Sequence, residues 1–250
     1  MSERAVGSEH DVDEPDESEL VTEDDTPVDN VFQEKQQRLL TSSLLDSWPG
    51  PPSPPGAQRP FVALSNVGLF FNPDEPPLVP DMLLSVDVSL PEDLGPKKNR
   101  SYFVWRFGKP PEVVIEVVSN REGRELGDKR QVYERIRVAH YVVFDPFGRL
   151  AGGRVRCFEL VGECYVDRLD ARFESLGLAL VEWEGRFEDH VGRWLRWASL
   201  DGEPVLTGAE RAEHERERAE HERERAEHER ARAERLAMRL RELGVDPEEP

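Results

Sequence analysis

The segment from Pro110 to Pro146 constrains the fold more than any other part of the sequence. It opens with the run VVIEVV at 113–118, which is apolar on both faces and rich in β-branched residues, the pattern of a strand buried from both sides. Residues 129–136 then have helical spacing, and a second apolar run at 141–144 ends before an Asp-Pro pair. Strand, helix and strand in this order predict two parallel neighbouring strands joined by a right-handed crossover.

Glu116 lies in the middle of the first of these strands. An ionised carboxylate inside a buried strand costs several kcal/mol unless a positive group holds it. The crossover helix carries Lys129 at a spacing that lets it share one face with Val132 and Tyr133, and Tyr133 itself is expected to be a core aromatic with a solvated hydroxyl. An acid in a core strand with a lysine on the next helix is the first indication of a chemical site.

The composition indicates one folded domain with solvated flanks. The chain has 250 residues, of which 37% are hydrophobic and 34% charged, and 20 are proline, which is little core material for a chain folded throughout. The net charge of −19 is uneven, because residues 1–30 carry 12 acids and one base whereas residues 60–200 carry 22 acids and 19 bases, a net of −3. The central part can therefore present local basic clusters, although the net charge of the whole chain disfavours a polyanionic partner.

We predict three regions along the chain. Residues 1–28 are an acidic, proline-punctuated tail that we expect to be disordered, residues 29–205 form the folded domain, and residues 206–245 form a charged helix. The sequence has no apolar run of about 18 residues and no basic-then-apolar N-terminus, so we expect no membrane span and a cytoplasmic location. In that reducing compartment Cys157 and Cys164 are expected to be inert packing groups.

Periodicity within the predicted domain indicates the remaining elements. An amphipathic helix is expected at 28–45. The expected strands lie at 61–71 (two short strands), 82–88, 102–107, 178–183 and 194–200, with an antiparallel hairpin between Arg149 and Arg168 that turns near Gly162. The predicted fold class is α/β, with a mixed central sheet flanked by helices and a long C-terminal helix.

The C-terminal helix is predicted to start at a capping box, Thr207-Gly-Ala-Glu210. A seven-residue repeat, RAEHERE, follows from Arg211 and supplies one alanine per heptad. A stable coiled coil needs two large apolar residues per heptad, so we expect a solvated rod and only a weak coiled coil. Homodimerisation or binding of a partner protein is expected near Leu236, Leu240 and Leu243.

Two acids are expected on adjacent core strands: Asp81, which follows Pro80 at the start of a strand, and Glu116. With Lys129 nearby they make a site for a divalent cation, and their hard oxygen ligands suit Mg²⁺ or Mn²⁺, which also bind phosphate oxygens and lower the pKa of a coordinated water. A lysine beside that water would orient it and offset the charge that develops on the phosphorane. Asp87 is a rival acid, because period-two spacing places it on the same face as Asp81 if the strand is regular.

The sequence from Asp81 through the 110–146 segment resembles the Uma2 family, which is classed as endonucleases with the PD-(D/E)XK, or restriction-endonuclease-like, fold. The resemblance covers roughly residues 30–205 and is most specific at 116–119, at Lys129 and over 141–146.

This resemblance implies that Asp81 and Glu116 bind the metal and that Asp81, Glu116 and Lys129 are the catalytic residues. The (D/E)XK motif has its lysine two residues after the acid, where this chain has Val118. The family pattern implies that Lys129 on the helix takes the place of the missing lysine.

The leading hypothesis is a Mg²⁺- or Mn²⁺-dependent endodeoxyribonuclease that hydrolyses DNA phosphodiester bonds with a metal-activated water. The basic residues expected to contact DNA phosphates are Lys97, Lys98, Arg100, Arg121 and Arg124. The alternative is a catalytically weak or silent nuclease fold that serves as an interaction module, with the C-terminal helix recruiting a partner. A repressor-like DNA-binding protein is disfavoured because the sequence has no basic recognition helix.

Overall fold

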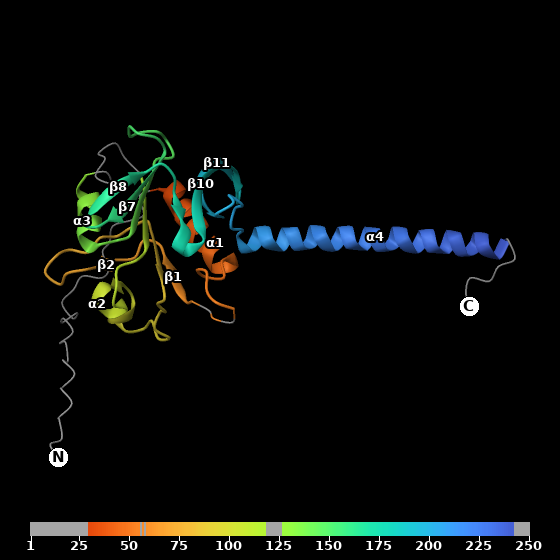
Figure 1. The fold of residues 1–250 in the computed structure, drawn as a ribbon, viewed down its shortest axis with the longest axis horizontal. Coiled ribbons are helices and arrows are strands. Elements are labelled where there is room, and N and C mark those ends of the chain that lie inside the picture. The colour runs from red at the N-terminus through yellow and green to blue at the C-terminus, as the bar shows by residue number, and fades with distance from the viewer. Residues whose placement is uncertain (1–29, 56, 58, 119–126, 243–250) are drawn as a thin grey trace, which may run out of the picture. The chain divides into compact units, whose positions relative to one another are not determined.

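The computed structural model describes residues 30–55, 57, 59–118 and 127–242 (Figure 1). The chain divides into two compact units, the first ending at Val205 and the second beginning at Leu206, and each is described by itself. The acidic tail predicted for residues 1–28 lies outside the described residues.

A six-stranded mixed sheet forms the centre of the first unit. Its strand order is β1-β3-β5-β6-β7-β8, and β5 and β6 are parallel while the other neighbours are antiparallel. The strands are β1 (Phe61–Leu64), β3 (Met82–Val86), β5 (Val113–Val117), β6 (His140–Phe144), β7 (Val155–Val161) and β8 (Cys164–Arg168). The strand-helix-strand prediction for the 110–146 segment is confirmed, because α3 (Asp128–Ile136) connects the parallel pair β5 and β6.

Strand β5 contributes side chains to a separate apolar cluster on each face of the sheet. Val113, Ile115 and Val117 belong to one cluster, and Val114 belongs to the other, together with Val118 just beyond the strand. All these side chains are at most 2% exposed, as the doubly apolar sequence run predicts. Because side chains alternate along a strand, Glu116 points to the same face as Val114 and Val118.

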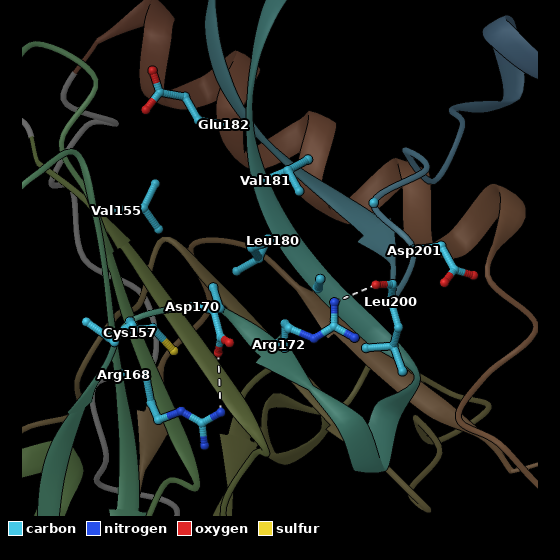
Figure 2. Close-up of a pocket in the computed structure, with 14 residues that line it drawn as sticks. Val155, Cys157, Arg168, Asp170, Arg172, Leu180, Val181, Glu182, Leu200 and Asp201 are labelled. Carbon is cyan, nitrogen blue, oxygen red and sulfur yellow. Dashed lines mark hydrogen bonds and ion pairs between the residues drawn. The ribbon is translucent and has the colours of Figure 1, made fainter.

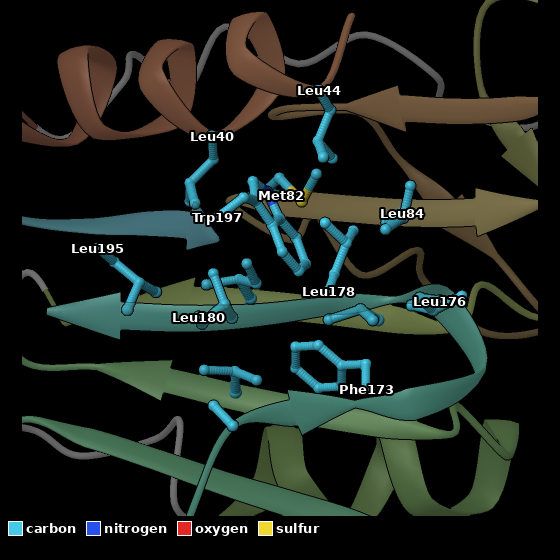
Figure 3. Close-up of a cluster of buried hydrophobic side chains, with 14 of the residues drawn as sticks. Leu40, Leu44, Met82, Leu84, Phe173, Leu176, Leu178, Leu180, Leu195 and Trp197 are labelled. Carbon is cyan, nitrogen blue, oxygen red and sulfur yellow. The ribbon is translucent and has the colours of Figure 1, made fainter. Parts of the chain in front are cut away.

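A helix and a second sheet cover the first face of the central sheet. The helix is α1 (Val31–Ser47), and the second sheet has the order β11-β10-β9, with bounds His190–Ser199, Leu178–Phe187 and Arg172–Phe173. Figure 3 shows Leu40 and Leu44 of α1 packing with Leu180 and Trp197 of this sheet and with Met82 of β3. Burial of these large side chains, at about 25 cal/mol per Å² of apolar area, supplies much of the driving force that fixes α1 against the sheet.

Helix α3 covers the opposite face. Its Tyr133 is fully buried in the second cluster with Tyr141 of β6 and Phe158 of β7. The remaining elements are short: β2 (Leu69–Phe70) pairs in parallel with β4 (Tyr102–Phe103), and the helical turns are η1 (Lys97–Asn99), α2 (Val104–Phe107) and η2 (Glu174–Leu176).

Two strand predictions differ from the structure. The strand expected at 102–107 stops after Phe103, because Val104–Phe107 form the helical turn α2, which ends at Gly108 in a left-handed conformation (φ 75°). The strands expected at 178–183 and 194–200 are longer than predicted and form a hairpin of two ten-residue strands, in which Phe187 pairs with His190. The other strands, the helix expected at 28–45 and the hairpin near Gly162 are confirmed within a few residues at their ends.

The second unit consists of the helix α4 (Gly208–Glu242). The predicted capping box is present: the Glu210 amide donates to the Thr207 hydroxyl (3.3 Å), and the Thr207 amide donates to the Glu210 carboxylate (2.8 Å). Side chains from 211 to 236 are all exposed. Of the helices in the described ranges, none combines the length and apolar character needed to cross a membrane.

Candidate active site

Asp81 and Glu116 lie side by side where β3 begins and β5 ends. Met82 pairs with Ile115 in the antiparallel register of these strands, which places Asp81 opposite Glu116. One oxygen of Asp81, Oδ2, accepts the backbone N–H of Val117 at 2.7 Å, so the carboxylate of one strand is fixed to the backbone of the next. The two predicted metal-binding acids therefore come together through strand pairing.

Two side chains of α3 hold the Glu116 carboxylate. Lys129 Nζ lies 2.8 Å from Oε2, and the Tyr133 hydroxyl donates to Oε1 at 2.7 Å. Lys129 and Tyr133 are four residues apart and so lie on one helix face, as the sequence predicts. The expectation that the Tyr133 hydroxyl is solvated is wrong, because this side chain is fully buried and its hydroxyl reaches Glu116.

Near neutral pH the Glu116 carboxyl is present in both its protonated and its ionised form. Its side chain is 2% exposed, and burial raises the pKa of its carboxyl from 4.5 to about 7, with the nearby Asp81 charge adding to the rise. The Lys129 ammonium and the Tyr133 hydroxyl act in the opposite direction, because both stabilise the ionised carboxylate. Burial and the negative charge of Glu116 in turn raise the pKa of Tyr133 well above 10, so its hydroxyl remains a proton donor.

Two glutamines of α1 complete the surroundings of the acids. Gln37 Nε2 donates to Asp81 Oδ1 at 2.6 Å, and Gln33 Nε2 donates to the Val117 carbonyl at 3.2 Å. Both side chains are almost fully buried. Sequence reasoning missed them, and the available signal was the presence of long amides on the same helix face as buried leucines, where they need partners.

Of the residues predicted to bind DNA, the three that the structure describes do not lie beside the acids. Lys97 and Lys98 are in η1 and Arg100 follows it, on a segment that leaves the end of β3 opposite to Asp81. The Arg100 guanidinium donates to the carbonyls of its own loop, at Leu94 and Gly95. Arg121 and Arg124 lie outside the described residues.

Asp87, the rival acid, lies apart from this cluster. Strand β3 ends at Val86, and Asp87 has a left-handed backbone (φ 60°) and forms an ion pair with Arg59 (2.7 Å). Hydrogen bonding to Arg59 lowers the pKa of Asp87, so this carboxylate is a structural ion-pair partner.

The donor set at Asp81 and Glu116 suits a hard cation. Two carboxylates on neighbouring strands offer the oxygen ligands that Mg²⁺ prefers, and Mg²⁺ commonly takes one or two carboxylates together with waters and substrate phosphates. Among the described residues no group of three His, Cys, Asp or Glu side chains is placed to hold a metal, so water and substrate oxygens would complete the coordination. The acid pair also favours a cation, because the negative charge of the half-buried Asp81 raises the pKa of the buried Glu116 carboxyl.

A pocket of about 510 Å³ lies away from the acid cluster, between the β7–β8 hairpin and β10 (Figure 2). Arg168 in its wall is bound to Asp170, and Arg172 donates to the Leu200 carbonyl. Burial raises the pKa of the Cys157 thiol in this wall to about 12, so the thiol stays protonated and is a weak nucleophile. Cys157 therefore gives this pocket no activated nucleophile.

The geometry described so far defines a mixed α/β domain that holds two acids and a lysine together at the end of its central strands. The Uma2 family, described as "putative restriction endonuclease", matches residues 22–184, and the chain belongs to this family. Its fold is restriction-endonuclease-like, which confirms the predicted fold class, and the family description suggests a nuclease. A comparison with curated proteins finds no match.

Proposed function

We propose that the protein is a Mg²⁺-dependent endodeoxyribonuclease, active also with Mn²⁺, that hydrolyses DNA phosphodiester bonds with a metal-activated water. Asp81 and Glu116 would hold the cation, and Lys129 would position the nucleophile. The observation that carries the proposal is the contact between a buried strand carboxylate and the helix lysine, 2.8 Å apart and next to a second acid. The Uma2 family, whose description suggests a nuclease, supports the same function.

Each residue of the cluster has a separate role in this proposal. When bound, Mg²⁺ supplies positive charge for phosphate oxygens and lowers the pKa of a coordinated water. The Lys129 side chain is 31% exposed, so its ammonium can leave Glu116 for a water or phosphate oxygen at the surface of the site. Tyr133 and Gln37 keep the two carboxylates in place while Lys129 moves.

The test is nicking of supercoiled plasmid DNA with Mg²⁺ or Mn²⁺. We expect Glu116→Ala and Lys129→Met to lose activity at least about 100-fold, the lower range for removing a group that acts on the reacting atoms. Asp87→Asn is the matched control, because it removes an acid close in sequence to Asp81 that belongs to another ion pair, and it should keep full activity. Equal nicking by wild type and Glu116→Ala would refute the assignment.

A second candidate function, the silent interaction module, is favoured by one observation. Each of the four carboxylate oxygens of Asp81 and Glu116 already accepts a hydrogen bond from this chain. A network satisfied in this way would also suit a scaffold that binds no ion. Calorimetry with Mn²⁺ separates the two candidates, since the nuclease should bind the ion and lose that binding in Glu116→Ala, whereas the scaffold should bind none.

A further inference from the structure

Three aromatic rings, Phe32, Phe147 and Trp194, form a small aromatic cluster outside the acid cluster. The Phe32 ring lies parallel to Trp194, with centroids 5.0 Å apart and an interplanar angle of 7°. The Phe147 ring packs on Phe32 in a tilted arrangement, with centroids 5.2 Å apart and an interplanar angle of 57°. Trp194 is 2% exposed, whereas Phe147 is 55% exposed. Phe147 is therefore an exposed ring that packs on the half-buried Phe32 ring, which in turn stacks on the buried Trp194.

This aromatic cluster lies at the same end of the sheet as the acids. Strand β6 ends at Phe144, whose carbonyl accepts the amide of Val118 (2.8 Å) just after Glu116 and Val117 on β5. Phe147 follows three residues later. On the other side, Phe32 precedes Gln33, which donates to the Val117 carbonyl.

A fixed turn presents Phe147 to the surface. The Gly148 amide donates to the Asp145 carbonyl at 3.3 Å, and the Leu150 amide donates to the Asp145 carboxylate at 2.6 Å. The Asp145 side chain is 1% exposed, so this anchor is buried. The Arg149 guanidinium lies over the Phe147 ring, 4.8 Å from its centroid.

An exposed aromatic ring with an arginine guanidinium over its face presents two planar groups against which a nucleobase can stack. Bases stack on aromatic side chains and on arginine planes in proteins that bind single strands, and this stacking tolerates any base sequence. In a duplex both faces of a base are already covered by its neighbours, so only an unpaired base can use such a ring. In a chain with a net charge of −19, stacking also supplies affinity that general attraction to phosphates does not.

We propose that Phe147, supported by Phe32, stacks an unpaired base of the DNA next to the cleaved phosphate, and that the protein therefore prefers single-stranded over duplex DNA. This inference rests on the proposed nuclease function and names its substrate class.

The experiment compares binding of a fluorescein-labelled oligothymidine with binding of the same strand in a duplex, by fluorescence anisotropy with Ca²⁺ in place of Mg²⁺. Wild type should bind the single strand more tightly. Phe147→Ala should weaken that binding about tenfold and leave duplex binding unchanged. Phe147→Trp should keep the affinity, whereas Phe147→Leu should lose it although it retains an apolar side chain over Phe32.

Val161→Ala is the matched control. Val161 is 58% exposed, close to the value for Phe147. It is the last residue of β7, and Val155 at the other end of that strand pairs with Phe144, so Val161 lies at the end of the sheet away from Phe144. The Val161→Ala variant should bind both probes as wild type does. Equal affinity of wild type for the two probes, or wild-type affinity in Phe147→Leu, would overturn the inference.

The two proposals fail in different ways. If the protein cleaves DNA with a metal and substitutions at Phe147 have no effect, the nuclease proposal holds and the stacking proposal is refuted. If the protein prefers single strands through Phe147 but cleaves no DNA with Mg²⁺ or Mn²⁺, the stacking proposal holds and the nuclease proposal is refuted.

Discussion

Glu116 is held between two opposing effects. Its burial disfavours the ionised carboxylate, while the Lys129 ammonium and the Tyr133 hydroxyl favour it. Removing Lys129 is costly because the buried Glu116 charge is then left without compensation, whereas Lys129 is partly exposed and can be solvated when Glu116 is replaced. A divalent cation beside Asp81 and Glu116 would favour the ionised form further.

The affinity for Mn²⁺ should therefore depend on pH. Because the ion needs ionised Glu116 and the pKa of that carboxyl is about 7 in the metal-free protein, each pH unit below 7 should lower the apparent affinity about tenfold. Above pH 7 the contribution of this group should level off. Calorimetric titrations between about pH 5.5 and 8 measure the effect, and an affinity that does not change over that interval would contradict the assignment of Glu116 as a ligand.

The stability of the metal-free protein should depend on pH in the opposite direction and should fall as pH rises. The pKa of Glu116 is raised on folding from 4.5 to about 7, so the folded state binds the proton more tightly, and this group's contribution to the free energy of unfolding falls as pH rises between those values. Glu116→Gln should remove that loss. In EDTA, the variant should be more stable than wild type by roughly 1–3 kcal/mol at pH 8 and nearly equal to it below the unfolded pKa.

Thermal or urea unfolding at the two pH values measures this difference. A variant that is less stable than wild type at pH 8 would show that the Lys129 ion pair outweighs the burial cost, contrary to the raised pKa.

At the scale of elements, helices bring the partners of the acids to the sheet. Helix α3 supplies Lys129 and Tyr133 from one face, and α1 supplies Gln37 from the other side of the strand ends. The leucines of α1 that pack in the core fix that helix in position, so its buried glutamines reach Asp81 and the end of β5 without a loop. The site is thus built on rigid elements, which suits chemistry that depends on position.

The capping box of α4 should control the start of that helix. Thr207→Ala removes the hydroxyl that accepts the Glu210 amide, which typically costs about 1 kcal/mol of helix stability. We expect faster amide hydrogen exchange in the first turn from Gly208, by roughly fivefold for that energy. Thr207→Ser retains the hydroxyl and should exchange as wild type does, and equal exchange in Thr207→Ala would show that the cap contributes nothing measurable.

At the scale of the whole molecule, the chain joins a compact nuclease-family domain to a charged helix. The domain has a large apolar cluster on each face of its central sheet, whereas the helix side chains from 211 to 236 are all exposed. Stability of the domain should therefore depend on its own core and be nearly independent of the helix.

Deleting residues 211–250 tests this independence. The deletion keeps the Thr207 cap and removes side chains that, from 211 to 236, are all exposed. We expect a midpoint of thermal unfolding within about 2 °C of wild type, because surface changes away from packed features usually alter stability by about 0.5 kcal/mol or less. Circular dichroism should show the loss of helical signal at the same time, and a large fall in the midpoint would indicate that the helix supports the domain.

The sequence by itself determined the central strands and the helix between them. Local patterns suffice there, because an uninterrupted β-branched run predicts a strand buried on both faces and Thr207-Gly-Ala-Glu210 predicts a helix start from nearest neighbours alone. The strand predicted at 102–107 was partly wrong because local propensity does not show that the chain turns after Phe103.

Only the tertiary structure decided which groups meet the two acids. Asp81 and Glu116 are 35 residues apart in sequence, and they face one another because of the register in which β3 pairs with β5. The amide of Gln37 reaches Asp81 across 44 positions of sequence, and the Tyr133 hydroxyl reaches Glu116 because α3 packs on that face. Strand register and helix packing are set by the fit of the whole core, so no local pattern contains them.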